Sequence, residues 1–149
     1  MAVHVRSESA DPQVSLARVR RQAQTILARL GEARSELSVL FVNNDAMRAL
    51  NQRFRGKNAP TDVLSFPLDE RLPGGGKLLG DVVISLEQAQ KQARAKRNRL
   101  NREVDWLLTH GILHLLGYDH ERSRKDERIM RSLERRLLAA LSRKRACRL

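Results

Sequence analysis

The sequence predicts a mixed α/β (α+β) domain in which a small sheet of three or four strands packs with about five helices. Short apolar runs typical of buried strands are interspersed with longer segments whose apolar residues recur at helical spacing. The chain has 149 residues, enough for one domain with a real core, and neither an internal repeat nor a long linker divides it. We therefore predict a single domain over residues 1–149, with a basic tail over about 142–149.

The first third of the chain predicts two helices and up to two strands. Apolar residues at helical spacing over 12–30, closed by Gly31, predict an amphipathic helix with a solvated arginine face. Residues 36–42 form an apolar run that predicts a buried strand, and residues 3–5 can form a short edge strand. An asparagine cap predicts a further helix over about 44–53.

The middle of the chain predicts an antiparallel hairpin. Strands over 61–67 and 78–85 flank a loop with three consecutive glycines, and we expect Pro67 to end the first strand. The glycines are not a phosphate-binding loop, because no helix opens directly after them. Ser85 then caps a helix over about 86–97.

The helix predicted over 101–116 is apolar on most sides, so we expect it to be the central buried helix. The sequence from Ser123 to Asp126 resembles a capping box and predicts the start of a last helix.

Three of the four histidines lie close together, in the pattern H-x3-H-x5-H. His110 and His114 are four residues apart, so on a helix their rings point into one volume. Gly117 can adopt the left-handed conformation that ends a helix, which lets His120 return toward the first two rings. The residues leave open that these are ordinary core histidines with satisfied hydrogen bonds.

Three converging imidazoles form a transition-metal site, most often for zinc. A site with three protein ligands keeps a position open for catalysis, where the metal lowers the pKa of a bound water and polarises a phosphoryl or carbonyl oxygen. We predict one Zn²⁺ per chain at the C-terminal end of the central helix. Zinc proteases of the H-E-x-x-H type carry a glutamate base after the first histidine, but this chain has Gly111 there.

A net charge of +12 and a pI near 11.2 favour polyanionic partners, RNA above all. Residues 91–102 contain several cations and no acid, which favours a phosphate-binding surface; the basic tail is equally explained as a solvated, charged surface. Aromatic residues are too scarce for a base-stacking platform. The predicted RNA-binding residues are Lys57, Lys91, Arg94, Lys96, Arg97 and Arg99.

Residues 1–10 contain no apolar h-region, so we expect no signal peptide, and no apolar stretch in the sequence is long enough to span a bilayer. Its single cysteine, Cys147, excludes a disulfide framework. We therefore expect a cytoplasmic protein without a membrane partner. The sequence does not indicate the oligomeric state.

Three motifs, in the same order, resemble those of one known family. Residues 110–120 resemble the H-G-x-L-H-L-x-G-Y-D-H signature of the YbeY endoribonucleases, which are bacterial rRNA maturation factors. Residues 50–67 are similar to that family's L-N-x-x-[YF]-R-G-K-x-x-P-T-[DN]-V-L-S-F-P run, and residues 79–85 to its L-G-D-[IV]-x-I strand. The resemblance covers about residues 36–140.

The resemblance implies a zinc-dependent, single-strand-specific endoribonuclease that acts in small-subunit rRNA 3′-end processing and in ribosome quality control. Its partners would be RNA, the small ribosomal subunit and assembly factors. Arg55 matches an arginine regarded as essential in the family, and a fixed cation there would meet the charge of the reacting phosphate. We take Arg55 and the ligand His114 as the catalytic residues.

Two carboxylates can each act in more than one way. Asp119 can orient an imidazole through its ring N–H or can cap the turn that contains it. Asp81 lies in an otherwise apolar strand, where it can orient a metal ligand or the substrate, or can be a bulge residue.

Two alternative functions remain. The protein can be a non-catalytic ribosome-assembly factor with a structural zinc, although structural zinc usually has four protein ligands. It can also be a metal-dependent hydrolase of another class, such as a peptidase or amidase, although the expected glutamate base is missing.

Overall fold

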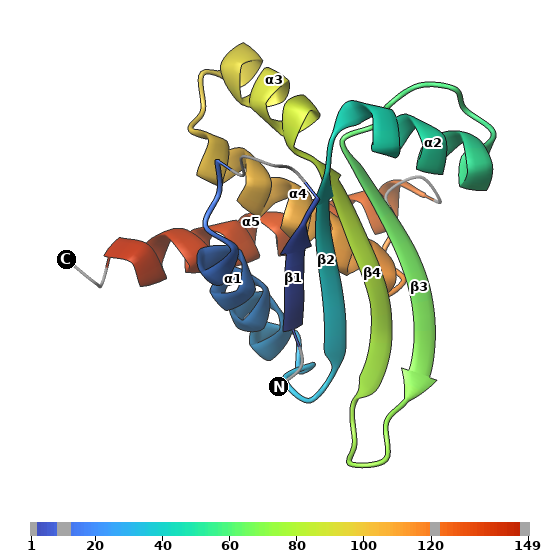
Figure 1. Cartoon of the computed structure of the whole chain (residues 1–149). Helices are drawn as coiled ribbons and strands as arrows, with labels where there is room; N and C mark the ends of the chain where they lie inside the picture. Colours follow the sequence, from blue (N-terminus) through green and yellow to red (C-terminus); the bar gives the residue numbers. More distant parts are fainter. Residues whose placement is uncertain (1–2, 9–12, 120–122, 147–149) are drawn as a thin grey trace.

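The computed structural model describes residues 3–8, 13–119 and 123–146, which form a four-stranded sheet with five helices (Figure 1). In chain order, the elements are β1 (Val3–Ser7), α1 (Leu16–Arg29), β2 (Glu36–Val42), α2 (Asn44–Arg55), β3 (Val63–Arg71), β4 (Lys77–Ser85), α3 (Leu86–Lys96), α4 (Leu100–Leu115) and α5 (Arg124–Ala146). The predicted fold class is therefore confirmed. None of the helices described is both long enough and apolar enough to cross a lipid bilayer.

The sheet is mixed and has the strand order β1-β2-β4-β3. β1 pairs with β2 and β2 with β4 in parallel, whereas β3 and β4 form the predicted antiparallel hairpin. β3 is thus an edge strand, with β4 as its neighbour in the sheet.

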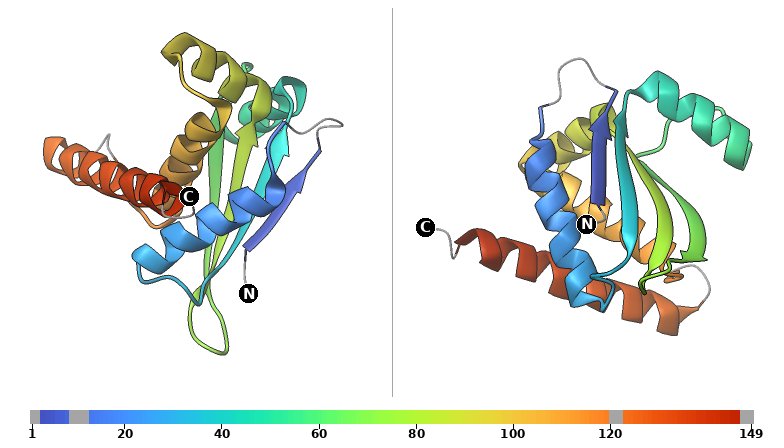
Figure 2. Two further views of the ribbon diagram at one scale, coloured as in Figure 1. Left: turned by 90° about the vertical axis from the view of Figure 1, so that its left-hand side faces the viewer. Right: turned by 60° about the horizontal axis from the view of Figure 1, so that its bottom comes forward.

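Helices cover the two faces of the sheet unequally. α1, α4 and α5 gather on one side, where they enclose the larger core, while α2 lies across one end of the other face (Figure 2). Successive side chains of a strand point to opposite faces. In β4, Val82 accordingly belongs to the larger core and Val83 to the smaller one under α2.

The central helix α4 joins the other elements through buried polar contacts as well as apolar packing. Its Asp105 carboxylate accepts hydrogen bonds from the Arg18 guanidinium at 2.7 Å and from the Gln22 side-chain amide at 3.1 Å. Both partners lie on α1, so this part-buried cluster fixes α1 against the first half of α4.

A glycine lets α4 pack closely against the sheet. A Cβ atom added to Gly111 would lie 2.7 Å from Cγ1 of Val82 and 3.3 Å from Cγ2 of Val63. At the same point, the Ser65 hydroxyl of β3 donates a hydrogen bond of 2.9 Å to the Gly111 carbonyl. The side of α4 that carries Gly111 therefore faces β3 and β4 directly.

The prediction that Pro67 ends its strand is wrong, because β3 continues to Arg71. The pairing with β4 shifts register between Pro67 and Glu70, where Asp69 has a φ of 55°. Proline is tolerated in edge strands and at bulges, since a missing N–H there need not break the ladder. β3 provides both conditions.

We expect Gly111→Ala to lower the free energy of unfolding by about 1–2 kcal/mol. Overpacking against the β-branched Val82 costs about 1–3 kcal/mol, and the better helix propensity of alanine offsets at most about 1 kcal/mol of this. Urea denaturation followed by circular dichroism measures the change. Gly74→Ala is the matched control, because an added Cβ there meets nothing within 4 Å. A Gly111→Ala protein as stable as the wild type would show that α4 is not seated through this residue.

Candidate functional site

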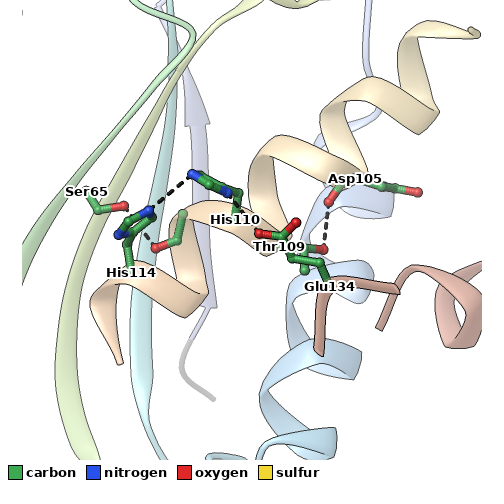
Figure 3. Close-up of polar contacts among 7 residues, drawn as sticks. Ser65, Asp105, Thr109, His110, His114 and Glu134 are labelled. Atoms are coloured by element: carbon green, nitrogen blue, oxygen red, sulfur yellow. Dashed lines mark hydrogen bonds and ion pairs between the residues drawn. The ribbon is translucent and has the colours of Figure 1, made fainter. Parts of the chain in front are cut away.

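Two of the predicted ligands lie side by side near the C-terminal end of α4. The Nε2 atoms of His110 and His114 are 3.1 Å apart, and the ring centroids are 4.6 Å apart at an interplanar angle of 66°. Both rings are only partly buried. Figure 3 shows the two imidazoles facing each other between β3 and the body of α4.

α4 ends in the glycine turn that the sequence predicts. Gly117 has a φ of 93°; its N–H donates to the His114 carbonyl at 3.0 Å, and the Tyr118 N–H donates to the Leu113 carbonyl at 3.0 Å. These two bonds form a Schellman motif, which reverses the chain after a helix. The turn brings Asp119 to the cavity beside the histidines. His120 lies outside the described residues.

His110 is held by two neighbours that the sequence analysis did not identify. Its Nδ1 atom lies 3.0 Å from a carboxylate oxygen of Glu134, on α5 (Figure 3). The Trp106 ring stacks on the imidazole, with centroids 5.2 Å apart and an interplanar angle of 18°. Ring plane and ring rotation are thus both restrained.

The sequence did carry one signal for Glu134. On α5, buried apolar residues recur at positions 130, 137 and 141, and position 134 continues this helical spacing. A carboxylate at a core position of an amphipathic helix requires a buried partner. Here that partner is His110.

Arg55 lines the same cavity as the two histidines. This cavity of about 430 Å³ is lined by residues from α2, β3 and α4, from the segment before β3 and from the turn after α4. Its polar and charged lining residues are Arg55, Thr61, Asp62, Ser65, His110, His114 and Asp119.

Short-range contacts place Arg55 at this cavity. α2 ends there because Gly56 adopts the left-handed conformation, with a φ of 70°. The following loop is tied back to α2 by the buried Asn51, whose side-chain amide donates to the Ala59 carbonyl at 2.7 Å. Asp62 then anchors the start of β3, since its carboxylate accepts from the Val63 N–H at 2.8 Å and from the Gln92 amide of α3 at 3.1 Å.

Asp81 is not brought to the histidines. It lines a separate cavity of about 440 Å³ with Phe54 and Phe66. Because Val82 contacts Gly111 of α4, the neighbouring Asp81 points to the opposite face of the sheet.

None of the predicted RNA-binding residues lines the cavity. Lys57 is exposed in the loop that follows Arg55, and the cationic run lies on α3 and the turn that leads into α4. At 1.5 Å per residue, Arg99 at the start of α4 lies about 20 Å from His114 along the helix axis. Lys96 is engaged within the fold: its Nζ is 3.0 Å from the buried Glu103 carboxylate and 4.5 Å from the centre of the Trp106 ring.

The described part of the site fits a metal but does not complete a ligand set. Among residues 3–8, 13–119 and 123–146, no group of three histidine, cysteine or acidic side chains is arranged to hold a metal ion. The two Nε2 atoms nevertheless fit one, because nitrogen ligands at about 2.0–2.1 Å from a tetrahedral zinc lie about 3.3 Å apart. The observed separation is 3.1 Å.

Comparisons with known proteins agree with one another. A family model described as Endoribonuclease YbeY matches residues 4–142. The Endoribonuclease YbeY of Anaeromyxobacter sp. (strain Fw109-5) is 50% identical over 131 residues, which cover 88% of this chain and 68% of that protein. That of Aquifex aeolicus (strain VF5) is 46% identical over 125 residues, covering 84% and 83%. The solution structure of TM1509 from Thermotoga maritima matches with a TM-score of 0.70 at 26% identity, covering 98% of this chain and 93% of that one.

We expect Asn51→Ala to lower the free energy of unfolding by about 1–2 kcal/mol, because it removes a part-buried hydrogen bond that anchors the loop after Arg55. Urea denaturation measures the stability, and hydrogen exchange measures protection of the backbone amides of residues 56–59. Gln52→Ala is the matched control, since Gln52 is exposed on the same helix and its loss is expected to change stability by no more than about 0.5 kcal/mol. Unchanged exchange in Asn51→Ala would show that other contacts hold the loop.

Proposed function

Because the chain belongs to the Endoribonuclease YbeY family, we propose that it is a zinc-dependent endoribonuclease that cuts single-stranded RNA. Its cellular substrate is ribosomal RNA, with a role in small-subunit 3′-end processing and in ribosome quality control. The family supports an RNA substrate. The zinc and the ribosomal role are our proposal. The same proposal has the protein work with the small subunit and its assembly factors in the cytoplasm.

One observation carries the proposal: a single cavity contains two facing imidazoles and an arginine from a distant part of the chain. His110 and His114 come from α4, and Arg55 comes from the end of α2. Imidazole nitrogens suit a zinc ion, and a guanidinium suits the oxygens of a phosphate. A phosphodiester is a substrate whose oxygens can bind both the zinc ion and the guanidinium.

The residues have separate tasks in this proposal. His110 and His114 would hold the zinc, with His120 as the predicted third ligand. When bound, zinc would supply a Lewis acid that polarises a phosphoryl oxygen. Arg55 meets the negative charge that grows on the phosphate oxygens as the bond breaks. Its exposed position lets an incoming strand reach it without opening the fold.

The charge distribution supports a strand that extends beyond the cavity. Arg99, in the exposed cationic run, lies about 20 Å from His114 along the axis of α4, a distance that a few nucleotides of a single strand can span. A net charge of +12 favours such backbone contacts, which hold RNA with little regard to sequence.

The packing of α4 disfavours a peptidase of the H-E-x-x-H type. The residue after His110 faces Val82 and Val63 of the sheet at van der Waals distance or less. A glutamate cannot occupy this position without displacing the helix, so the general base of that class has no place here.

We expect the wild type to cut single-stranded RNA and His114→Ala to cut none. Arg55→Ala should be slower by about 100-fold, the usual loss when one group that stabilises a transition state is removed. Initial rates on a labelled single-stranded RNA, with all proteins purified in parallel, measure this. Chelation should abolish wild-type cleavage, and added Zn²⁺ should restore it.

Arg53→Ala is the matched control for Arg55→Ala. It removes the same charge from the last turn of α2, but Arg53 does not line the cavity. Circular dichroism checks that each variant is folded. Equal cleavage by the wild type and His114→Ala would identify a contaminating ribonuclease, and a non-catalytic assembly factor with a structural zinc would then be the better proposal.

A further inference from the structure

We propose that Glu134 is a positioning residue for the metal site: it selects the tautomer of His110 and aims its Nε2 atom, a role that rests on the function proposed above. Glu134 lies on α5, 24 residues after the histidine, and reaches it from the side opposite to His114 (Figure 3). The contact is specific to the folded chain, because the two helices meet only in the tertiary structure.

The burial of the pair makes the contact effective. The side chains of His110 and Glu134 are 18% and 12% exposed, and the distance between Nδ1 and the carboxylate oxygen is 3.0 Å. A hydrogen bond to a carboxylate is stronger than one between neutral groups, and reduced contact with water strengthens it further.

An ionised carboxylate can only accept hydrogen bonds. Nδ1 of His110 must therefore carry the proton, and in the neutral ring the lone pair then resides on Nε2. That nitrogen is the one that faces Nε2 of His114 at 3.1 Å. Glu134 thus sets the tautomer of His110 that can bind a metal through Nε2, already in the metal-free protein.

Trp106 completes the restraint. Its ring lies nearly parallel to the imidazole of His110, so it limits tilting of the ring out of plane. Glu134 limits rotation within the plane by holding one ring nitrogen. A carboxylate that orients a ligating histidine in this way typically changes metal affinity by about 10–100-fold.

Glutamine at position 134 distinguishes positioning from simple packing. It has nearly the same size as glutamate, so the packing of α5 is preserved. Its amide oxygen can accept a hydrogen bond from a protonated Nδ1, and its NH2 group can equally donate one to an unprotonated Nδ1. The variant therefore loses the selection of one tautomer while it retains a side chain of the same shape.

The test combines two measurements on the full chain. Competition with a chromophoric chelator gives the Zn²⁺ affinity of the wild type and of Glu134→Gln, and we expect the variant to bind about 10–100-fold more weakly. Nitrogen chemical shifts of the imidazole rings in the metal-free protein report the tautomer, in a buffer alkaline enough that free imidazole is uncharged. We expect the Nδ1–H form of His110 in the wild type and a mixture in the variant.

Glu127→Gln is the matched control. Glu127 lies two turns earlier on α5 and pairs with Arg131 on an exposed surface at 2.8 Å, so its loss should change neither measurement. Circular dichroism shows whether each variant folds. If Glu134→Gln does not fold, the wild-type tautomer alone decides, because an Nε2–H form of His110 contradicts the proposal.

The outcomes separate this inference from the proposed function. If the wild type binds zinc and Glu134→Gln binds it equally well, or keeps a single Nδ1–H tautomer, the role of Glu134 is overturned and the proposed nuclease is untouched. If the wild type itself binds no zinc, the zinc-dependent function fails, and the positioning role fails with it.

Discussion

The close packing of α4 against β3 and β4 determines which side of the helix can carry chemistry. Successive residues of a helix are about 100° apart around its axis. Gly111 faces Val82. The residue just before Gly111 and the residue three positions after it must therefore point along the sheet toward its β3 edge. His110 and His114 hold these positions, so their rings emerge at the side of the core instead of inside it.

Other parts of the chain converge on this side because the fold leaves it accessible. α2 crosses the opposite face of the sheet, yet its last residue reaches the same cavity around the edge strand β3. α5 packs on α4 from the other direction and contributes Glu134. α2 and β3 are consecutive in the chain, as are α4 and α5, but β4 and α3 separate the first pair from the second. The site therefore exists only when the whole domain is folded, and stability and site geometry are coupled.

The sequence predicted most of the elements because their boundaries have local causes. Ser85 begins α3 and Gly117 ends α4, each through hydrogen bonds to residues close in sequence, and the structure contains both of these caps. Pro67 misled the prediction, since its effect depends on whether the strand lies at an edge, and that is a property of the sheet order. The pairing of His110 and His114 followed from helical spacing alone.

The rest of the site depends on packing that no local pattern encodes. Glu134 reaches His110 across a helix interface, and Asp81 points away because the pleat of β4 directs its neighbour toward α4. The motif resemblance identified Arg55, but its position relies on the turn at Gly56 and the tether from Asn51.

The irregular backbone of β3 also affects whether two copies of this protein can pair through their sheet edges. A regular edge strand presents a row of unpaired backbone groups that can template pairing with another molecule and so nucleate aggregation. In β3, Pro67 removes one donor, the register shift before Glu70 interrupts the row, and charged residues follow. We expect this edge to resist intermolecular pairing. That protection matters most at high local concentration, when many copies of a basic protein crowd onto one long polyanion.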